Sequence, residues 1–298
     1  MKRLLLFSML MAFTGISYGQ QGRIVRYPDF SSEYIRSRNV DVWLPPSYDS
    51  QPDKNYPVLY MHDGQNLFED TLAGFGTEWG IDEAITTLSA EGKIPECIVV
   101  GIWNTPNRYP EYQPQKPYGK LDPEYRKEVT ELYGAEAVSD SYLRFLTSEL
   151  KPFVDSVFRT LPGRETTFIM GSSMGGLVSI YALCEYQDLF AGAGCLSTHW
   201  VTRVDLENAE MARVMEDYLE DNLPVPGRHR IYFDYGTAGL DAWYEPHQMR
   251  IDSVMAGKGY TRGEDWETMK FEGADHNESS WRERLHIPLE FLLRDLPK

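Results

Sequence analysis

The chain has 298 residues, of which 42% are hydrophobic and 25% charged, and its formal net charge is −16. An acidic surface repels nucleic acids and anionic lipids, so the composition predicts neither as a partner. The length is close to the limit of one hydrophobic core, about 250–300 residues, and one domain is therefore expected.

Residues 1–19 have the features of a secretory signal peptide. Two basic residues precede an apolar run, Leu4–Ile16, and the small residues Ser17 and Gly19 form a cleavage site. The run is too short to cross a membrane comfortably; an uncleaved anchor or a buried N-terminal helix is the alternative. We therefore expect an exported protein, periplasmic or secreted, without stable membrane insertion after cleavage, whose mature domain is residues 20–298.

The three cysteines, Cys97, Cys184 and Cys195, all lie in apolar strand or helix contexts. An odd number leaves at least one thiol free even in an exported protein. The chain contains no C-x-x-C spacing, so neither a zinc site nor a redox motif is expected. We expect no metal, no organic cofactor and no dependence of the fold on disulfides.

Hydrophobic patterning predicts strands that alternate with helices along the mature chain. The expected strands are Gly22–Tyr27, Ser37–Leu44, Tyr56–Met61, Cys97–Ile102, Thr166–Met170, Ala191–Ser197, Arg230–Tyr235 and Trp266–Phe271. The expected helices are Ile81–Ala90, Ser139–Phe158, Met174–Glu185, Asn208–Leu219, Pro246–Ala256 and Ser280–Arg294. This alternation predicts a single α/β domain with a mostly parallel, doubly wound sheet.

Two segments depart from this regularity. Trp103–Tyr133 is rich in proline and tyrosine with little periodicity, and we expect a long loop that is either functional or flexible. Pro152 falls inside the amphipathic helix Ser139–Phe158 and is expected to kink it.

A G-x-S-x-G motif, Gly171–Gly175, lies between an apolar β-rich run and a helix-forming run. That order is typical of a nucleophile elbow, a sharp turn that exposes a serine hydroxyl at the end of a strand. Ser173 is therefore the expected nucleophile. The N–H of Met174, at the start of the helix, is expected to bind a developing oxyanion.

A serine nucleophile needs a general base and an orienting carboxylate. His276 lies between the last strand and the last helix, where the base is expected, whereas His199, His229, His247 and His286 are weaker candidates by position. Asp241, in the glycine-rich loop after the strand Arg230–Tyr235, is the expected acid, with Asp234 and Glu245 as alternatives.

The second oxyanion donor should come from the loop after the third strand. Gln65 follows Asp63 and Gly64 in that loop and is the expected donor. The alternative interpretation of His62–Phe68 is a tight turn with a glycine hinge.

Four segments together resemble the esterase D-like branch of the α/β hydrolases, the esterase family that includes feruloyl, acetylxylan and enterochelin-type esterases. They are Tyr60–Phe68, Phe145–Leu150 with the proline that follows, Gly171–Gly176 and Gly273–His276. The resemblance implies an α/β-hydrolase fold, a triad with Ser173 and His276, and Gln65 and Met174 as oxyanion donors. It also implies an acid in a Gly-Thr-x-Asp-like turn, which is lengthened here to Gly236–Asp241.

Four residues after strand ends are candidates for substrate binding. Trp103 or Trp200 could stack on an aromatic acid or sugar ring, Arg108 could pair with a substrate carboxylate, and His199 lies beside Trp200. The equally weighted alternative is that these residues only pack the loops and do not bind substrate.

These features predict an exported serine carboxylic ester hydrolase that acts through a Ser-His-Asp triad and an acyl-enzyme. The expected partner is a small-molecule or polysaccharide ester, with feruloyl or acetyl groups on carbohydrate as the first choice. A siderophore (enterochelin-type) esterase and an acyltransferase are alternatives within the same chemistry. A carbohydrate-binding protein with a decayed triad is the alternative from a different class. Nothing in the sequence predicts the oligomeric state.

Overall fold

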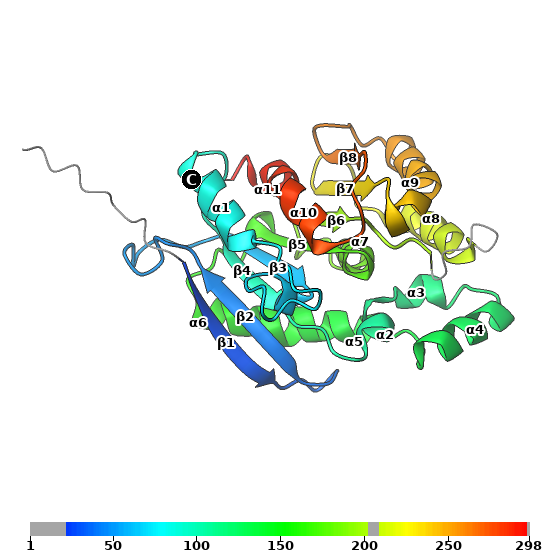
Figure 1. Ribbon diagram of the computed structural model, residues 1–298, viewed down its shortest axis with the longest axis horizontal. Coiled ribbons are helices and arrows are strands. Elements are labelled where there is room, and N and C mark those ends of the chain that lie inside the picture. Colours follow the sequence, from blue (N-terminus) through cyan, green and yellow to red (C-terminus); the bar gives the residue numbers. More distant parts are fainter. Residues whose placement is uncertain (1–21, 202–208, 297–298) are drawn as a thin grey trace, which may run out of the picture.

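The computed structural model describes residues 22–201 and 209–296, which form one α/β domain around an eight-stranded sheet (Figure 1). The expected signal peptide lies outside the described residues, as does Asn208, the expected start of a helix. The strands are β1 Arg23–Phe30, β2 Arg38–Leu44, β3 Val58–His62, β4 Ile98–Ile102, β5 Thr167–Ser172, β6 Gly192–Leu196, β7 Arg230–Gly236 and β8 Trp266–Phe271.

The spatial order of the strands is β1-β2-β4-β3-β5-β6-β7-β8. β1 and β2 are antiparallel to their neighbours, whereas the six strands β3 to β8 form a parallel set. β4, the next strand in the chain, lies on one side of β3, and β5 lies on the other side of β3. The carboxyl ends of β3 and β5 therefore form the topological switch point, where open parallel sheets bind their ligands.

Helices cover both faces of the sheet. They are α1 Ile81–Ala90, α2 Arg108–Tyr112, α3 Gln115–Tyr118, α4 Pro123–Tyr133, α5 Ser139–Arg144, α6 Lys151–Val157, α7 Met174–Glu185, α8 Glu210–Asn222, α9 Glu245–Gly257, α10 Glu278–Arg284 and α11 His286–Leu293. Short 3-10 turns occupy Gly64–Asn66, Arg164–Thr166 and Gly239–Trp243. In the described residues no helix is long and apolar enough to cross a membrane.

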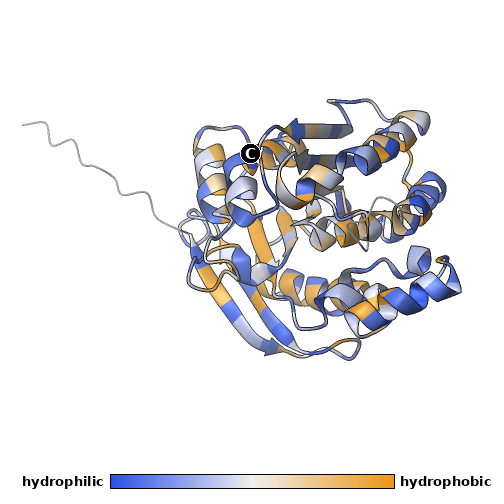
Figure 2. Cartoon of the chain, turned by 45° about the vertical axis from the view of Figure 1, so that its right-hand side comes forward, coloured by the Kyte–Doolittle hydropathy of each residue, from blue (hydrophilic) through white to orange (hydrophobic). Residues whose placement is uncertain are grey.

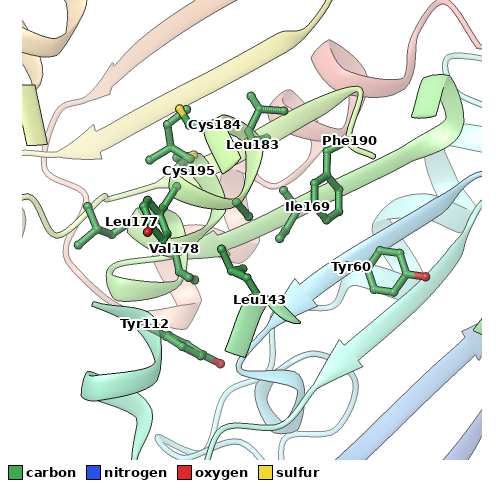
Figure 3. Close-up of a cluster of buried hydrophobic side chains, with 14 of the residues drawn as sticks. Tyr60, Tyr112, Leu143, Ile169, Leu177, Val178, Leu183, Cys184, Phe190 and Cys195 are labelled. Atoms are coloured by element: carbon green, nitrogen blue, oxygen red, sulfur yellow. The ribbon is translucent and has the colours of Figure 1, made fainter. Parts of the chain in front are cut away.

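Alternating side chains of the strands feed two separate hydrophobic cores. Tyr60 and Ile169 point to the larger core, which α5 to α9 cover, while Met61 and Met170 point to the smaller core beneath α1, α10 and α11. Figure 3 shows part of the larger core, where Leu177 of α7 lies near the sheet. In Figure 2 the hydrophobic colouring is strongest on inner strands of the sheet, whereas the edge strands carry more hydrophilic residues.

All eight expected strands and the parallel topology are confirmed, but two helical expectations need correction. The segment Trp103–Tyr133 is not a long loop: it contains α2, α3 and α4, and Asp122 caps α4 by accepting bonds from two N–H groups of its first turn. The closing helix is divided at Leu285 into α10 and α11. These helices are short or largely polar, so they leave a weak periodic signal.

The expected irregularity around Pro152 takes the form of a π-helical stretch, Phe145–Leu150, between α5 and α6. Proline has no N–H for the bond to the preceding turn, and the wider turn just before it accommodates that loss. Cys97, Cys184 and Cys195 are all free and buried.

Candidate active site

Ser173 is the single residue between β5 and α7, and its backbone is strained. Its φ of 58° and ψ of −123° lie in a region that residues with a side chain rarely adopt. Its N–H donates to the carbonyl of Leu196 at 2.9 Å, which ties the turn to the end of β6. A Cβ on Gly171 would lie 2.8 Å from the backbone of Gly175, so the strand-to-helix turn requires glycine there.

His276 and Asp241 come from neighbouring loops at the carboxyl ends of β8 and β7. The Nδ1 of His276 lies 2.6 Å from Oδ1 of Asp241. The carboxylate of Asp241 is completely buried and also accepts bonds from the Gly236 N–H at 2.7 Å and the Ser197 hydroxyl at 2.5 Å. Burial alone would raise the pKa of Asp241, but these donors, led by His276, hold it below its usual value.

The two alternative acids are engaged elsewhere. Asp234 is buried and forms an ion pair with Arg284 at 2.9 Å. Glu245 pairs with Lys270 at 3.0 Å on the surface. Of the three candidate acids, Asp241 is therefore the one that the structure brings to His276.

A network behind Asp241 was not evident from the sequence. Ser197, the residue after β6, has a φ of 42° and donates its hydroxyl hydrogen to Asp241. Its oxygen accepts bonds from Trp281 Nε1 and from Arg284, each at 2.9 Å. The position of Ser197 at a strand end was a usable signal, whereas its partners on α10 become visible only once the helix is docked.

Aromatic rings enclose the imidazole of His276. Tyr244 and Trp281 both meet it edge-on, with ring centroids at 5.6 and 5.1 Å. The side chain of His276 remains 13% exposed, and its backbone N–H is held by Asp275. The ring is therefore fixed in orientation while part of it still reaches the surface.

The loop after β3 packs directly on β4. A Cβ on Gly64 would lie 2.4 Å from the backbone carbon of Gly101, so only glycine fits there. Asp63, with a φ of 56°, receives a two-pronged ion pair from Arg108 at 2.7 and 2.8 Å. Gln65 is the second residue of its 3-10 turn and Met174 the first residue of α7, positions whose N–H groups have no carbonyl partner within the helix. Both N–H groups keep their hydrogen-bonding capacity for another acceptor.

Among the four candidate binding residues, Arg108 lies at this loop but is already paired with Asp63. Burial raises the pKa of Asp63, but Arg108, together with Asn104 and His62, more than offsets that effect, so the pKa is lowered. His199 is buried with its Nδ1 2.6 Å from the hydroxyl of Tyr244. Burial lowers the pKa of His199 to about 3, so its ring is neutral at pH 7.

The two tryptophans are held by the body of the domain. Trp103 donates to Asp41 of β2 at 2.8 Å, and Arg26 lies over its ring. Trp200 is only 1% exposed and donates to Gln248 at 3.0 Å. These contacts favour the packing alternative for Trp103 and Trp200.

Among the described residues, no group of three or more His, Cys, Asp or Glu side chains is arranged to hold a metal.

A strained serine between β5 and α7 at the switch point, with an aspartate and a histidine on following loops, characterises the α/β-hydrolase fold. The family model named "Esterase", described as "Putative esterase", matches residues 31–291. The chain therefore belongs to this family and is a carboxylic ester hydrolase.

Individual relatives are distant. The uncharacterized protein YbbA of Bacillus subtilis (strain 168) is 26% identical over 202 residues, which are 67% of this chain and 68% of that protein. A solved ferulic acid esterase is similar with a TM-score of 0.64 and 19% identity, covering 92% of this chain and 98% of the other. The enterobactin esterase FES from Shigella flexneri gives a TM-score of 0.63 and 16% identity, covering 91% of this chain and 58% of the other. These structural likenesses establish the fold.

Proposed function

We propose that the protein is an exported serine esterase whose triad is Ser173, His276 and Asp241. The observation that carries this proposal is the strained backbone of Ser173 at the end of β5. Such strain costs about 1–3 kcal/mol and persists where function requires it. The bond between Asp241 and His276 supplies the orienting contact that a catalytic base needs.

In this mechanism the hydroxyl oxygen of Ser173 attacks the ester carbonyl carbon while Nε2 of His276 accepts the proton. The N–H groups of Gln65 and Met174 bind the resulting oxyanion. His276 then protonates the leaving alcohol, and the acyl group remains on Ser173. Water, deprotonated by His276, attacks the acyl-enzyme, and the released acid leaves Ser173 with its proton restored.

For the substrate we propose an acyl ester on carbohydrate, with feruloyl and acetyl esters as the first candidates. The structural similarity to a ferulic acid esterase supports the aromatic acyl group. The similarity to an enterobactin esterase makes a siderophore lactone the second candidate. Hydrolysis of methyl ferulate, an acetylated xylan and enterobactin under identical conditions separates the candidates by their kcat/KM values.

Export is proposed from residues 1–19. Expression of the full chain with its leader should yield a mature protein that begins at Gln20. N-terminal sequencing of the exported material tests this, and a protein that retains Met1 and stays with the membrane would contradict it.

The triad is tested by Ser173→Ala with p-nitrophenyl acetate and methyl ferulate as substrates. The variant should lose several orders of magnitude in kcat, about 10⁶ where such a triad has been dissected. Ser172→Ala is the matched control, because Ser172 is the adjacent strand residue and should leave the chemistry intact. Equal activity of Ser173→Ala and the wild type would refute the proposed nucleophile.

A further inference from the structure

Glu278 is a buried carboxylate beside the candidate site that the proposed mechanism does not use. It lies in the first turn of α10, two residues after His276, and is 4% exposed. Burying a carboxyl group is costly unless it is hydrogen-bonded. Its side-chain partner is Nδ2 of Asn66, at 3.1 Å from Oε1.

Asn66 directly follows Gln65 and closes the 3-10 turn of the loop after β3. It is buried, and both its backbone and its side chain are engaged. Its Oδ1 accepts from the Gly74 N–H at 2.9 Å, while its carbonyl accepts from the Trp79 N–H at 2.8 Å. The bond to Glu278 uses one of the two hydrogens of the side-chain amide. Any movement of this turn therefore breaks several buried bonds at once.

The two residues are 212 positions apart in the sequence, and their bond joins the two loops that the proposed mechanism needs in a fixed relation. One loop carries Gln65, an expected oxyanion donor, and the other carries His276. Around the bond, the rings of Trp79 and Trp281 pack at 5.4 Å and Arg282 lies 3.3 Å from Glu78. The interface between the two loops is therefore packed around the Asn66–Glu278 bond.

We propose that Asn66 and Glu278 are a pair of positioning residues whose hydrogen bond holds the oxyanion turn in register with His276. This proposal rests on the proposed function of Gln65 and His276. The pair acts through the loops it joins and does not itself touch the reacting atoms. Its loss should lower kcat while KM changes little, because misplaced donors weaken the transition state more than the bound ester.

The chemistry of the pair allows an exchange that keeps the bond. In Asn66→Asp, two carboxyl groups face each other and the donor is lost. In the double variant Asn66→Asp/Glu278→Gln, the glutamine amide donates to the new aspartate, and the other aspartate oxygen still accepts from Gly74. Glu278→Gln alone retains an oxygen that accepts from Asn66, whereas Glu278→Leu leaves the amide of Asn66 without a partner.

The test measures kcat, KM and Tm with p-nitrophenyl acetate for all four variants. Glu278→Leu and Asn66→Asp should lower kcat about 10- to 100-fold, which is up to the loss expected for a misplacement of about 1 Å and less than that for complete removal of an oxyanion donor. Glu278→Gln and the double variant should stay close to the wild type. Glu283→Leu is the matched control, since Glu283 is an exposed residue on the same helix.

Two outcomes would overturn the proposal: wild-type kcat in Glu278→Leu, or a double variant no more active than Asn66→Asp. If Glu278→Leu fails to fold, the comparison of Asn66→Asp with the double variant decides alone. Failure of the proposed function would be seen separately, because Ser173→Ala would then keep its activity. Loss of activity in Ser173→Ala without rescue in the double variant would reject only the positioning pair.

Discussion

At the scale of single residues, the role of each buried acidic side chain depends on which hydrogen-bond donors surround it. Asp241 and Asp234 are both buried near the end of β7, yet they have different partners. Asp234 is neutralised by Arg284, whereas Asp241 receives the imidazole of His276 and two further donors. Only the second arrangement leaves a carboxylate aimed at a titratable ring, which is what the proposed mechanism needs.

Replacement of the proposed acid tests this distinction. In Asp241→Asn the amide can donate toward Nδ1, which favours the wrong imidazole tautomer, and kcat should fall by about 10⁴. Glu245→Gln, which changes only a surface pair with Lys270, should leave kcat unchanged. Steady-state hydrolysis of p-nitrophenyl acetate measures both. Similar losses in the two variants would reject the special role of Asp241.

At the scale of elements, the site depends on loops that pack backbone against backbone. The turn after β3 contacts β4 at Gly64, where even one added carbon would lie within 2.4 Å of Gly101. The same turn carries Gln65 and is held from the other side by Arg108 through Asp63. The position of the proposed oxyanion donor is therefore set by the close approach of this turn to β4.

Gly64→Ala should consequently displace the turn. Overpacking of this kind destabilises a protein by about 1–3 kcal/mol, and kcat should fall together with Tm. Gly163→Ala is the control, because its added carbon meets nothing within 4 Å and its backbone is ordinary. Thermal unfolding measures Tm and ester hydrolysis measures kcat for both variants. An active Gly64→Ala with an unchanged Tm would show that the turn tolerates the side chain.

The sequence predicted an element well where its hydrophobic periodicity and its length indicated the same type of structure. Examples are α7 and β8, whose expected and observed bounds are the same. It failed for α4, which buries only Tyr125 and Val129 among eleven residues and so has little periodic signal. The order of strand, turn and helix around the G-x-S-x-G motif predicted Ser173, and the position between the last strand and the last helix predicted His276. The Asn66–Glu278 bond could not be predicted, since it depends on how two distant loops pack.

At the scale of the whole molecule, the stability should depend on two neutral histidines buried near the switch point. Burial lowers the pKa of both His62 and His199 to about 3. A histidine with a lowered folded pKa gives its full stabilisation above the unfolded value of 6.5, and loses it as the pH falls toward about 3. The unfolded state takes up a proton in this range and the folded state does not.

His199→Gln isolates one of these contributions. Below pH 6.5 the free energy of unfolding of the wild type should fall relative to the variant by about 1.4 kcal/mol per pH unit. Urea denaturation of both proteins at pH 7.5, 6.0 and 5.0 measures the difference. A constant difference across these pH values would mean that His199 is protonated in the folded protein.

The central claim is that Ser173 forms the acyl-enzyme, and covalent labelling tests it most directly. The wild-type protein would be treated with an aryl fluorophosphonate, digested and mapped by mass spectrometry, with Ser173→Ala alongside. The account predicts one adduct, on the peptide that contains Ser173, together with loss of esterase activity and no labelling of the variant. An adduct on another residue, or ester hydrolysis that survives without any adduct, would contradict it.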